Sequence, residues 1–492
     1  MKRIIISGAG SHCGKTTAAC GLISAFREHG LKVCAYKTGP DYIDTQYLRS
    51  AAQCEAYNLD TWLMTPERVR ELFMMTSGDK DIAVIEGAMG LYDGGINSTA
   101  EIAKLLDAPV IAVINAKSVG ETAASIALGL REYDNEINLA GVILNHAGYD
   151  SHVKIISDAL NRTGIKLLGA IKRNDKLSIP ERHLGLLPVN ENMNYDFDSV
   201  RAVIESCVNI DEVIRVSESS CEISEILSSW PCVNHKVRIA IAKDKAFTFY
   251  YPESIYTLRE MGAEIIYFSP IRDSELPKAD GYIFGGGFPE IFAGELEMNT
   301  SMRESVRECA NSGAFILAEC GGYMYLCDSL TDINGKKFHM AGAIHRAAFM
   351  TDKPVIGYIE AKALSGNILC SEGGIIRGHE FHYSRVSQED TFALSMTRRK
   401  TGESYASSHE FNDSDFSCSM TRRKTEKTYA SGHDFHDSNF AFTMTRRRTG
   451  ESYWGGYVRG NILASYLHIN FFGNLKLAEH FLSRIDIKQT SR

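Results

Sequence analysis

Short apolar runs alternate with longer amphipathic stretches over residues 1–150. Each run is almost continuous in Val, Ile, Leu and Ala, which is typical of strands buried on both faces of a parallel sheet. The strands predicted in this way lie at the start of the chain ("MKRIIISGAG") and at residues 31–39, 81–90, 108–116 and 139–147. We therefore predict an α/β domain whose parallel sheet is covered by helices on both sides.

The same alternation begins again at "HKVRIAIAKD" (235–244), after a polar and partly helical stretch. Apolar runs follow at 263–270, 279–287 and 314–318, and a late strand, "NILASYLHINFF" (461–472), is expected to end at His468. This second series predicts a doubly wound α/β domain. The predicted organisation is a first domain at 1–190, a connector at 191–235 and a second domain at 236–492.

The composition narrows the possible environments of the chain. A length of 492 residues with 44% hydrophobic positions predicts a soluble protein of two or three domains, and the net charge of −8 predicts neither nucleic acid nor an anionic membrane as a partner. The twelve cysteines lack paired spacing, which predicts reduced thiols. The N-terminal strand leaves no room for a signal peptide, and no apolar run reaches the ~18 residues of a membrane span. We expect a cytoplasmic protein, with a homodimer as one candidate assembly.

A glycine-rich loop, "SGAGSHCGKTT" (7–17), follows the first strand and leads into a helix. Gly8, Gly10 and Gly14 allow backbone N–H groups to converge on phosphate oxygens at the helix N-terminus. Lys15 can reach the terminal phosphates, and Thr16 can offer its hydroxyl to magnesium. The strand before the loop and the helix after it favour a nucleotide site over a simple glycine turn with a surface lysine.

Polar residues are also found where the predicted strands of the first domain end, and these ends meet at one edge of a parallel sheet. They are Lys37, Asp41, Asp44, Glu86, Asp93 and Asn145. Glu86 ends an apolar strand, and a carboxylate buried there needs a cation or a hydrogen-bond donor. We favour a magnesium ion over an acidic cap on the next turn. The loop "TGPDYIDTQYL" (38–48) fits either a phosphoryl-acceptor site or an exposed acidic turn.

A second site is predicted around Cys320, where an apolar run stops in "GAFILAECGGYMYL" (313–326). A sharp strand-to-helix corner would hold Sγ clear of the sheet, and the helix N-terminus is expected to lower the pKa of the thiol. Gly286 and Gly287, also at a strand end, are candidate backbone donors of an oxyanion hole. A buried structural thiol beside a glycine turn is the alternative for this stretch taken alone.

Several of the fifteen histidines compete for the role of a base beside the thiol. His345, His382 and His468 are the candidates, and His468 is the one that closes a predicted strand facing the corner. A base in this position would remove the thiol proton as sulfur attacks an acyl group.

Six motifs follow one another in a single order along nearly the whole chain: "GAGSHCGKTT", "KTGPDYIDT", "GGGFPE", "ECGGYMYL", "RGHEFHYS" and "ASYLHINFF". This set resembles the cobyrinic acid a,c-diamide synthase family. That family joins an ATP-binding P-loop domain, similar to dethiobiotin synthetase, to a class I glutamine amidotransferase domain. The resemblance therefore implies both the fold class and the presence of two active sites.

The resemblance also implies roles for individual residues. Cys320 would form the glutamyl thioester, and His468 would raise its nucleophilicity. The other implied roles are ATP binding by Gly8, Gly10, Gly14, Lys15, Thr16, Thr17 and Asn145 (the last reading adenine), Mg²⁺ binding by Thr16, Glu86 and Asp93, and substrate binding by Lys37, Asp41, Tyr42, Ile43 and Asp44. Asn470 stands where class I enzymes usually carry a triad carboxylate, so the cysteine is expected to rely on His468 alone.

The implied reaction is the amidation of the a and c acetate carboxylates of cobyrinic acid. ATP would activate each carboxylate as an acyl phosphate, and glutamine hydrolysis would supply the ammonia. One alternative is the same amidation on nickel sirohydrochlorin. A second is a regulatory ATPase of the partitioning type with an inactive amidotransferase domain, which the intact cysteine, glycines and histidine disfavour.

A segment with a period of 24 residues occurs three times, at 395–411, 419–435 and 443–460, each copy containing "MTRR". The copies are polar and lack a periodic apolar face, so they are not expected to stack a core. The arginine pairs are offset by Asp and Glu, which argues against a nucleic-acid patch. We predict a tandem duplication that inserts a solvated loop at about 396–443.

Overall fold

The computed structural model describes residues 1–174, 195–220, 237–387 and 439–490, together with short pieces between them (177, 179, 181–182, 185–186, 189, 223, 230, 396–397 and 404–405). The chain forms two compact units. One contains Met1–Arg238, Phe249–Ile265 and Ile469–Arg492, and the other contains Ile239–Thr248 and Ile266–His468. Each unit is built on its own parallel sheet, which confirms the predicted α/β class.

A seven-stranded parallel sheet forms the centre of the first unit, in the order β3-β2-β4-β1-β5-β6-β7. Its strands are β1 (Lys2–Gly8), β2 (Val33–Thr38), β3 (Ala56–Leu59), β4 (Ile82–Glu86), β5 (Val110–Asn115), β6 (Leu139–Ala147) and β7 (Leu167–Lys172). The apolar runs predicted five of them. The two edge strands, β3 and β7, were not predicted, because neither is a long continuous apolar run.

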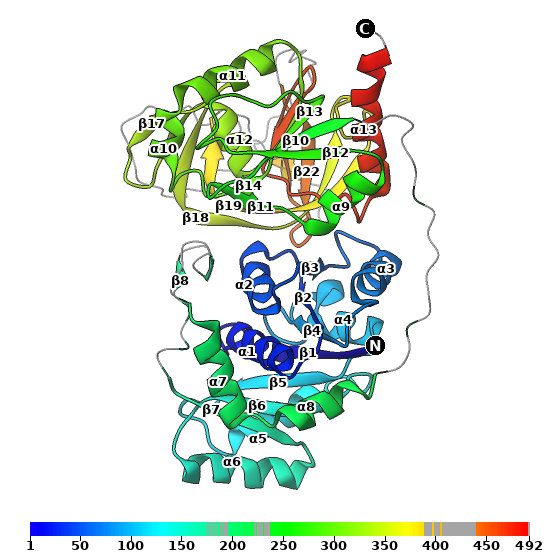
Figure 1. Ribbon diagram of the computed structural model, residues 1–492, viewed down its shortest axis with the longest axis vertical. Coiled ribbons are helices and arrows are strands. Elements are labelled where there is room, and N and C mark those ends of the chain that lie inside the picture. Colours follow the sequence, from blue (N-terminus) through cyan, green and yellow to red (C-terminus); the bar gives the residue numbers. More distant parts are fainter. Residues whose placement is uncertain are drawn as a thin grey trace. The chain divides into compact units, whose positions relative to one another are not determined.

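The order of the strands fixes where the helices lie. The chain moves from β1 toward β3 and then returns toward β7, and right-handed crossovers place the helices of these two directions on opposite faces. The helices are α1 (Lys15–Glu28), α2 (Tyr42–Ala52), α3 (Pro66–Ser77), α4 (Thr99–Leu105), α5 (Thr122–Glu132) and α6 (Asp150–Thr163) (Figure 1). The chain leaves β1 toward β3, whereas its neighbours β4 and β5 lead toward β7, so the loop after β1 opens at the topological switch point where such sheets bind ligands.

Two further helices, α7 (Phe197–Cys207) and α8 (Ile210–Ser217), fall within the stretch expected to be a connector. They belong to the first unit, where α7 packs against α1 and β7 (Figure 1). Ile204 of α7 is fully buried, and its side chain lies where a Cβ on Gly21 of α1 would clash. Helices α9 (Pro252–Glu260) and α13 (Leu475–Thr490) also belong to this unit.

A second parallel sheet carries the thiol site, with the order β10-β13-β15-β25 and the antiparallel strand β24 beside β25. The strands are β10 (Arg238–Ala242), β13 (Gly281–Phe284), β15 (Phe315–Glu319), β25 (Ile462–Ser465) and β24 (Tyr457–Arg459). Helices α10 (Ala293–Met298) and α11 (Thr300–Asn311) connect β13 to β15 in the chain, and α12 (Gly321–Leu326) directly follows β15. The prediction that the last parallel strand reaches His468 is wrong. β25 ends at Ser465, after which the chain leaves the sheet.

A separate, mainly antiparallel sheet completes the second unit. Its order is β17-β16-β18-β22-β23, with β19 also paired to β18. The strands are β16 (Cys327–Thr331), β17 (Lys337–His339), β18 (Ile344–Ala363), β19 (Ile375–Val386), β22 (Phe442–Arg446) and β23 (Ser452–Gly455). The short pair of β11 (Phe247–Phe249) and β14 (Gly286–Gly287) lies apart from both sheets.

The third copy of the 24-residue repeat is part of this sheet and not a loop. It forms the hairpin of β22 and β23, in which Met444 pairs with Tyr453 and is almost fully buried. The corresponding residues of the first copy pair in the same register, Met396 with Tyr405, in β20 (Met396–Thr397) and β21 (Ser404–Tyr405). Most of the predicted insertion at 396–443 lies outside the described residues.

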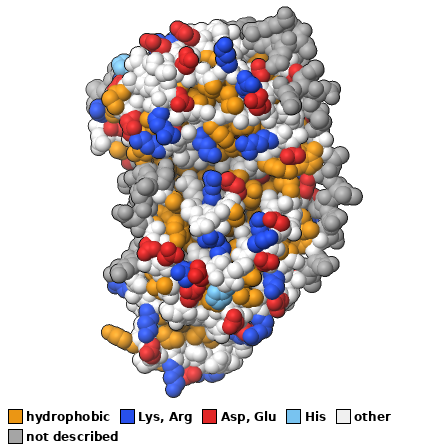
Figure 2. All heavy atoms as spheres, in the orientation of Figure 1, with side chains coloured by type: hydrophobic (Ala, Val, Ile, Leu, Met, Phe, Trp, Pro, Cys, Tyr) orange, Lys and Arg blue, Asp and Glu red, His pale blue; other side chains and the backbone are white. Residues whose placement is uncertain are grey.

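The surface carries charges of both signs. Figure 2 shows lysine and arginine interspersed with aspartate and glutamate over the visible face, without one large patch of either sign. In the described part of the chain, no helix combines the length and the apolar character needed to cross a bilayer.

Candidate functional site

The glycine-rich loop connects β1 to α1, and Asn145 supports it. Gly14 has φ of +93°, and a Cβ added there would lie 2.1 Å from Asn145 Nδ2, so this position requires glycine. Asn145 Nδ2 also donates a hydrogen bond to the Cys13 carbonyl oxygen at 3.0 Å. Lys15 is almost fully buried and donates from Nζ to the Gly10 carbonyl oxygen at 2.7 Å. The lysine ammonium group is therefore held within the loop.

The remaining loop candidates have structural contacts of their own. The Gly8 carbonyl oxygen accepts a hydrogen bond from the Leu91 N–H at 2.9 Å, and Thr17 Oγ1 donates to the Leu177 carbonyl oxygen at 3.4 Å. The side-chain oxygen of Asn145 accepts from the His146 N–H at 2.9 Å, so both ends of this amide are engaged. Recognition of adenine by Asn145 stays a prediction.

A chain of polar contacts links the loop to the neighbouring strands. Thr16 Oγ1 donates to Glu86 Oε1 at 2.6 Å, and Lys37 Nζ lies 3.0 Å from the same oxygen. Lys37 Nζ also forms an ion pair with Asp44 Oδ2 at 2.6 Å. Four elements that are separate in the sequence, α1, β4, β2 and α2, thus contribute one side chain each to a continuous network.

Burial sets the electrostatics of this network. Glu86 is fully buried, and burial raises its pKa to about 7 even though the Lys37 ammonium opposes the shift. Burial alone would lower the pKa of Lys37, but the charges of Asp44 and Glu86 outweigh it and raise the pKa above its usual value. Lys37 is therefore a cation at physiological pH, next to a carboxyl group that titrates near neutrality.

Thr16 and Glu86 fit the expected magnesium site. Glu86 Oε2 is buried without a hydrogen-bond partner among the described residues, and hydroxyl and carboxylate oxygens are preferred ligands of Mg²⁺. Asp93 is not part of this polar network. Its Oδ2 accepts a hydrogen bond from the Gly90 N–H at 2.8 Å, in a turn that lies against Ala9 of the glycine-rich loop. No cluster of three or more His, Cys, Asp or Glu side chains suited to a metal occurs in the described part, so an ion here would need phosphate oxygens as further ligands.

The residues expected to bind the substrate lie at the start of α2. Asp41 caps this helix, since its Oδ1 accepts from the backbone N–H groups of Ile43 at 2.8 Å and Asp44 at 2.9 Å. Tyr42 and Ile43 are buried in the first turn, and Asp44 faces Lys37. The ion pair of Asp44 excludes the alternative of an exposed acidic turn.

The strand-to-helix corner predicted at Cys320 is present. Cys320 has φ of +48° and ψ of −103° between β15 and α12, a conformation that is strained for any residue other than glycine. Its backbone N–H donates to the Ser465 carbonyl oxygen at 2.7 Å, which fixes the corner to β25. A strained turn of this kind is how nucleophile elbows expose a reactive side chain above a sheet.

The glycine run lies beside this corner, because β13 and β15 are neighbouring parallel strands. Gly287 has φ of +154°, and a Cβ there would lie 2.1 Å from the Ala246 carbonyl oxygen, so glycine is required. The Gly287 nitrogen lies 3.1 Å from the place that a Cβ on Gly321 would occupy. Gly286 and Gly287 thus adjoin the turn after Cys320, although their role as oxyanion donors stays a prediction.

The expectation that helix α12 lowers the pKa of the thiol is wrong. Cys320 is 5% exposed, and burial raises its pKa well above the usual value. The nearby Glu290 carboxylate adds to the rise, and a hydrogen bond from the Gly321 N–H opposes it without reversing it. A helix of six residues ends too soon to outweigh this burial. The thiol therefore needs a base to take its proton as it reacts.

Strand β19 contacts both His468 and the Cys320 thiol, through residues two positions apart. The backbone N–H and C=O of His468 pair with those of His379 at 2.9 and 3.1 Å, and Cys320 Sγ lies 4.0 Å from the Phe381 carbonyl oxygen. His382, the residue after Phe381, donates from Nδ1 to the Ser384 carbonyl oxygen at 2.8 Å. His345 is exposed and faces Asp328, away from these contacts.

Sequence reasoning missed Glu319, the residue directly before the cysteine. Its Oε2 lies 3.3 Å from His468 Nδ1, although the two residues are 149 positions apart. The available signal was an acidic residue at the end of a buried strand, the same signal that singled out Glu86.

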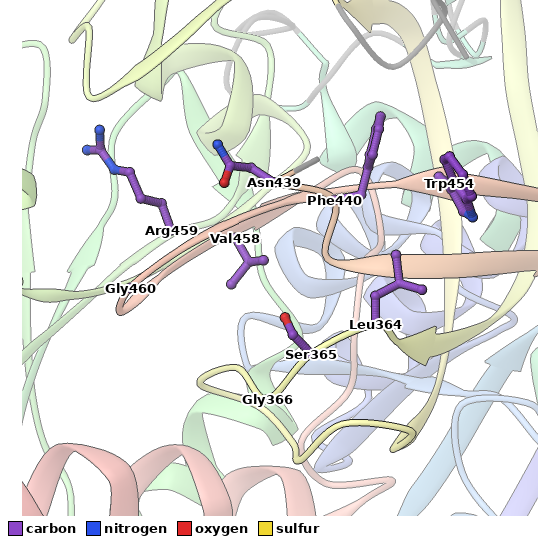
Figure 3. A pocket seen from close by; sticks show the side chains of 9 residues that line it. All are labelled: Leu364, Ser365, Gly366, Asn439, Phe440, Trp454, Val458, Arg459 and Gly460. Carbon is purple, nitrogen blue, oxygen red and sulfur yellow. The ribbon is translucent and has the colours of Figure 1, made fainter. Parts of the chain in front are cut away.

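A surface pocket of about 710 Å³ opens elsewhere on the second unit, between the loop after β18 and the hairpins of β22–β23 and β24–β25 (Figure 3). The rings of Phe440 and Trp454 lie side by side at its edge, with centroids 5.9 Å apart. None of the residues predicted for either site lines this pocket.

Two family models match the chain: the CobQ/CobB/MinD/ParA nucleotide binding domain over residues 4–187 and the CobB/CobQ-like glutamine amidotransferase domain over residues 238–414. A protein of Picrophilus torridus named cobyrinate a,c-diamide synthase is 45% identical over 396 residues, which covers 79% of this chain and 89% of that protein. A protein of the same name from Dehalococcoides mccartyi strain 195 is 37% identical over 501 residues, covering 98% and 97%. The chain therefore belongs to the cobyrinate a,c-diamide synthase family.

Proposed function

We propose that this protein uses ATP and glutamine to amidate the a and c acetate carboxylates of cobyrinic acid. Membership of the family supports a ligase that takes its nitrogen from glutamine, and it argues against the regulatory ATPase. The observation that carries the proposal is Cys320 on a strained corner, with His468 paired to the same strand that the thiol contacts, in a chain that also holds a phosphate loop.

The first half-reaction takes place at the phosphate loop. A carboxylate does not accept ammonia at neutral pH because oxide is a very poor leaving group, whereas an acyl phosphate loses phosphate readily. Lys15 and Lys37 would neutralise charge on the transferring phosphoryl group and the substrate carboxylate. Magnesium, when bound by Thr16 and Glu86, would neutralise charge on the phosphates.

The second half-reaction takes place at Cys320. As the thiol proton moves to His468, sulfur attacks the side-chain carbonyl carbon of glutamine, and the developing oxyanion is stabilised by backbone donors of the Gly286–Gly287 turn. The proton then passes to the leaving amide nitrogen, ammonia departs, and water hydrolyses the thioester. The ammonia attacks the acyl phosphate and releases phosphate.

The direct test is an assay of the purified protein with cobyrinic acid, ATP and Mg²⁺, with either glutamine or ammonium chloride as the nitrogen source. Mass spectrometry should show a monoamide and then a diamide, with stoichiometric ADP. Nickel sirohydrochlorin is the matched competitor substrate. Amidation of that compound alone would assign the sister activity, and ATP hydrolysis without any amide would contradict the proposal.

A further inference from the structure

The imidazole of His468 faces a carboxylate that comes from an unexpected position. Glu319 is the last residue of β15, and its Oε2 lies 3.3 Å from His468 Nδ1. The imidazole is 1% exposed and the carboxylate 12% exposed, so water screens this pair little. Asn470, two positions after His468, forms hydrogen bonds with other residues. Its Nδ2 donates to Glu253 at 2.8 Å, and its Oδ1 accepts from the Gly473 N–H.

We propose that Glu319 is the positioning residue of His468, so that the residue directly before the nucleophile completes a cysteine–histidine–carboxylate set. The carboxylate accepts the Nδ1–H of His468, which fixes the tautomer and leaves the lone pair on Nε2. Nε2 then takes the Sγ proton of Cys320 and later delivers it to the departing amide nitrogen of glutamine. This inference rests on the proposed glutamine hydrolysis.

Backbone hydrogen bonds hold both members of the pair. Glu319 is paired with Ser465 in the parallel register of β15 and β25, and the next N–H, that of Cys320, donates to the Ser465 carbonyl oxygen. Three residues later His468 exchanges two backbone hydrogen bonds with His379. Because both backbones are anchored by hydrogen bonds, bringing the carboxylate and the imidazole together costs no additional backbone entropy.

Two neighbouring histidines are held neutral. The ring of His379 stacks on that of His468 with centroids 4.9 Å apart, and burial followed by the charge of His468 lowers the pKa of His379 well below its usual value. Burial lowers the pKa of His382 to about 3. Neither ring competes with His468 for the thiol proton at physiological pH.

The other carboxylate facing this cluster has partners of its own. Glu380 accepts a hydrogen bond from the Tyr453 hydroxyl, and its Oε2 lies 3.9 Å from the Arg446 guanidinium. Burial raises the pKa of Glu380 despite these contacts. Glu319 is thus within hydrogen-bonding distance of His468. Glu380 interacts with His468 through its charge at longer range.

The test compares Glu319→Gln, Glu319→Asp and the control Glu360→Gln, an exposed carboxylate on β18 of the same unit. Glutaminase kcat and KM are measured separately, together with amidation from ammonium chloride. Glu319→Gln should lower glutaminase kcat/KM by on the order of 100-fold and leave the ammonium reaction unchanged. The loss should appear in kcat and not in the KM for glutamine, because the carboxylate orients the base and does not bind the substrate.

Glu319→Asp separates charge from geometry. It keeps a charged acceptor for the Nδ1–H of His468, while the shorter side chain lowers kcat to an intermediate value. A Glu319→Gln enzyme whose glutaminase kcat/KM stays within threefold of the wild type would overturn the inference. Loss of the ammonium reaction as well would make Glu319 a structural residue and also overturn it. A wild-type enzyme without glutaminase activity would instead contradict the proposed function.

Discussion

Burial determines the charge state of the reactive side chains, and the two sites use it in opposite ways. At the phosphate loop, two carboxylates around Lys37 keep a buried lysine charged. At the corner after β15, burial and nearby carboxylates keep the Cys320 thiol protonated. We infer that the nucleotide site offers a permanent cation, whereas the thiol becomes a nucleophile only while a base removes its proton.

Substitution Cys320→Ser should abolish glutamine-dependent amidation and leave the ammonium-dependent reaction intact. A hydroxyl is a far weaker nucleophile than a thiol in this setting, and the phosphate loop is unchanged. Amide formation from each nitrogen source measures the effect. Cys370→Ser, in the loop between β18 and β19, is the matched control and should behave as wild type. Loss of both reactions in a folded Cys320→Ser enzyme would refute the assignment of two separate sites.

Substitution Lys15→Ala should stop amidation from either nitrogen source. The lysine lies inside the phosphate loop, and removing a cation that stabilises a transferring phosphoryl group costs on the order of several kcal/mol in the transition state. ADP release and amide formation are measured together, with Lys32→Ala, an exposed lysine of the same unit, as control. Ammonium-dependent synthesis near the wild-type rate would show that the loop does not bind the reacting phosphates.

At the scale of elements, the first turn of α2 connects the expected substrate residues to the phosphate loop. Asp41 caps the helix, and Asp44 reaches Thr16 through Lys37 and Glu86. Residues of the same turn should therefore differ in effect. Those in the polar network should influence the nucleotide, and those packed in the apolar first turn should influence the substrate alone.

The predicted contrast is between Ile43→Val and Asp44→Asn. Ile43→Val removes one buried methylene at a cost of about 1 kcal/mol, so the enzyme should fold and show an altered KM for cobyrinic acid or an altered ratio of monoamide to diamide. Its KM for ATP should stay within twofold of the wild type. Asp44→Asn removes the negative charge that pairs with Lys37, and it should change both the KM for ATP and the KM for cobyrinic acid. A large rise in the KM for ATP in Ile43→Val would contradict this division of roles.

At the scale of the whole molecule, the duplicated segment joins two points of the second unit that are close in space. Ser387, after β19, donates from its N–H to the Ala347 carbonyl oxygen at 2.8 Å. The ring of Phe440, before β22, lies 5.3 Å from the guanidinium of Arg346. Both ends thus meet adjacent residues of β18, and a short connection is enough to join them.

Deletion of residues 396–443 should yield a folded enzyme with glutamine-dependent activity within several-fold of the full chain. Ser395 then precedes Met444, and Phe392, Ala393 and Leu394 replace the buried Phe440, Ala441 and Phe442. Changing Phe to Leu costs about 1 kcal/mol, and shortening the loop changes closure entropy by only ~2 kcal/mol. Thermal unfolding and glutaminase turnover test this. Normal folding with lost turnover would reveal a function of the repeats.

The sequence by itself determined the features that depend on neighbouring residues. The apolar periodicity predicted most strands of the two parallel sheets, because a strand buried on two faces must be apolar throughout. The glycines around Lys15 and after Cys320 marked the two turns, because Gly14 has a positive φ and a Cβ on Gly322 would lie 2.1 Å from the Phe284 carbonyl oxygen. The ordered motifs identified the family, and the sequence relatives confirm it.

The tertiary structure decided the features that depend on strand register. Glu319 meets His468 because β15 and β25 are neighbours with one particular alignment, and Lys37 meets Glu86 because β2 lies beside β4. The third copy of the repeated segment joins the antiparallel sheet because it lies beside β18. The pattern of neighbouring residues cannot specify such pairings, because contacts between distant residues depend on the order and register of the strands in the folded sheet.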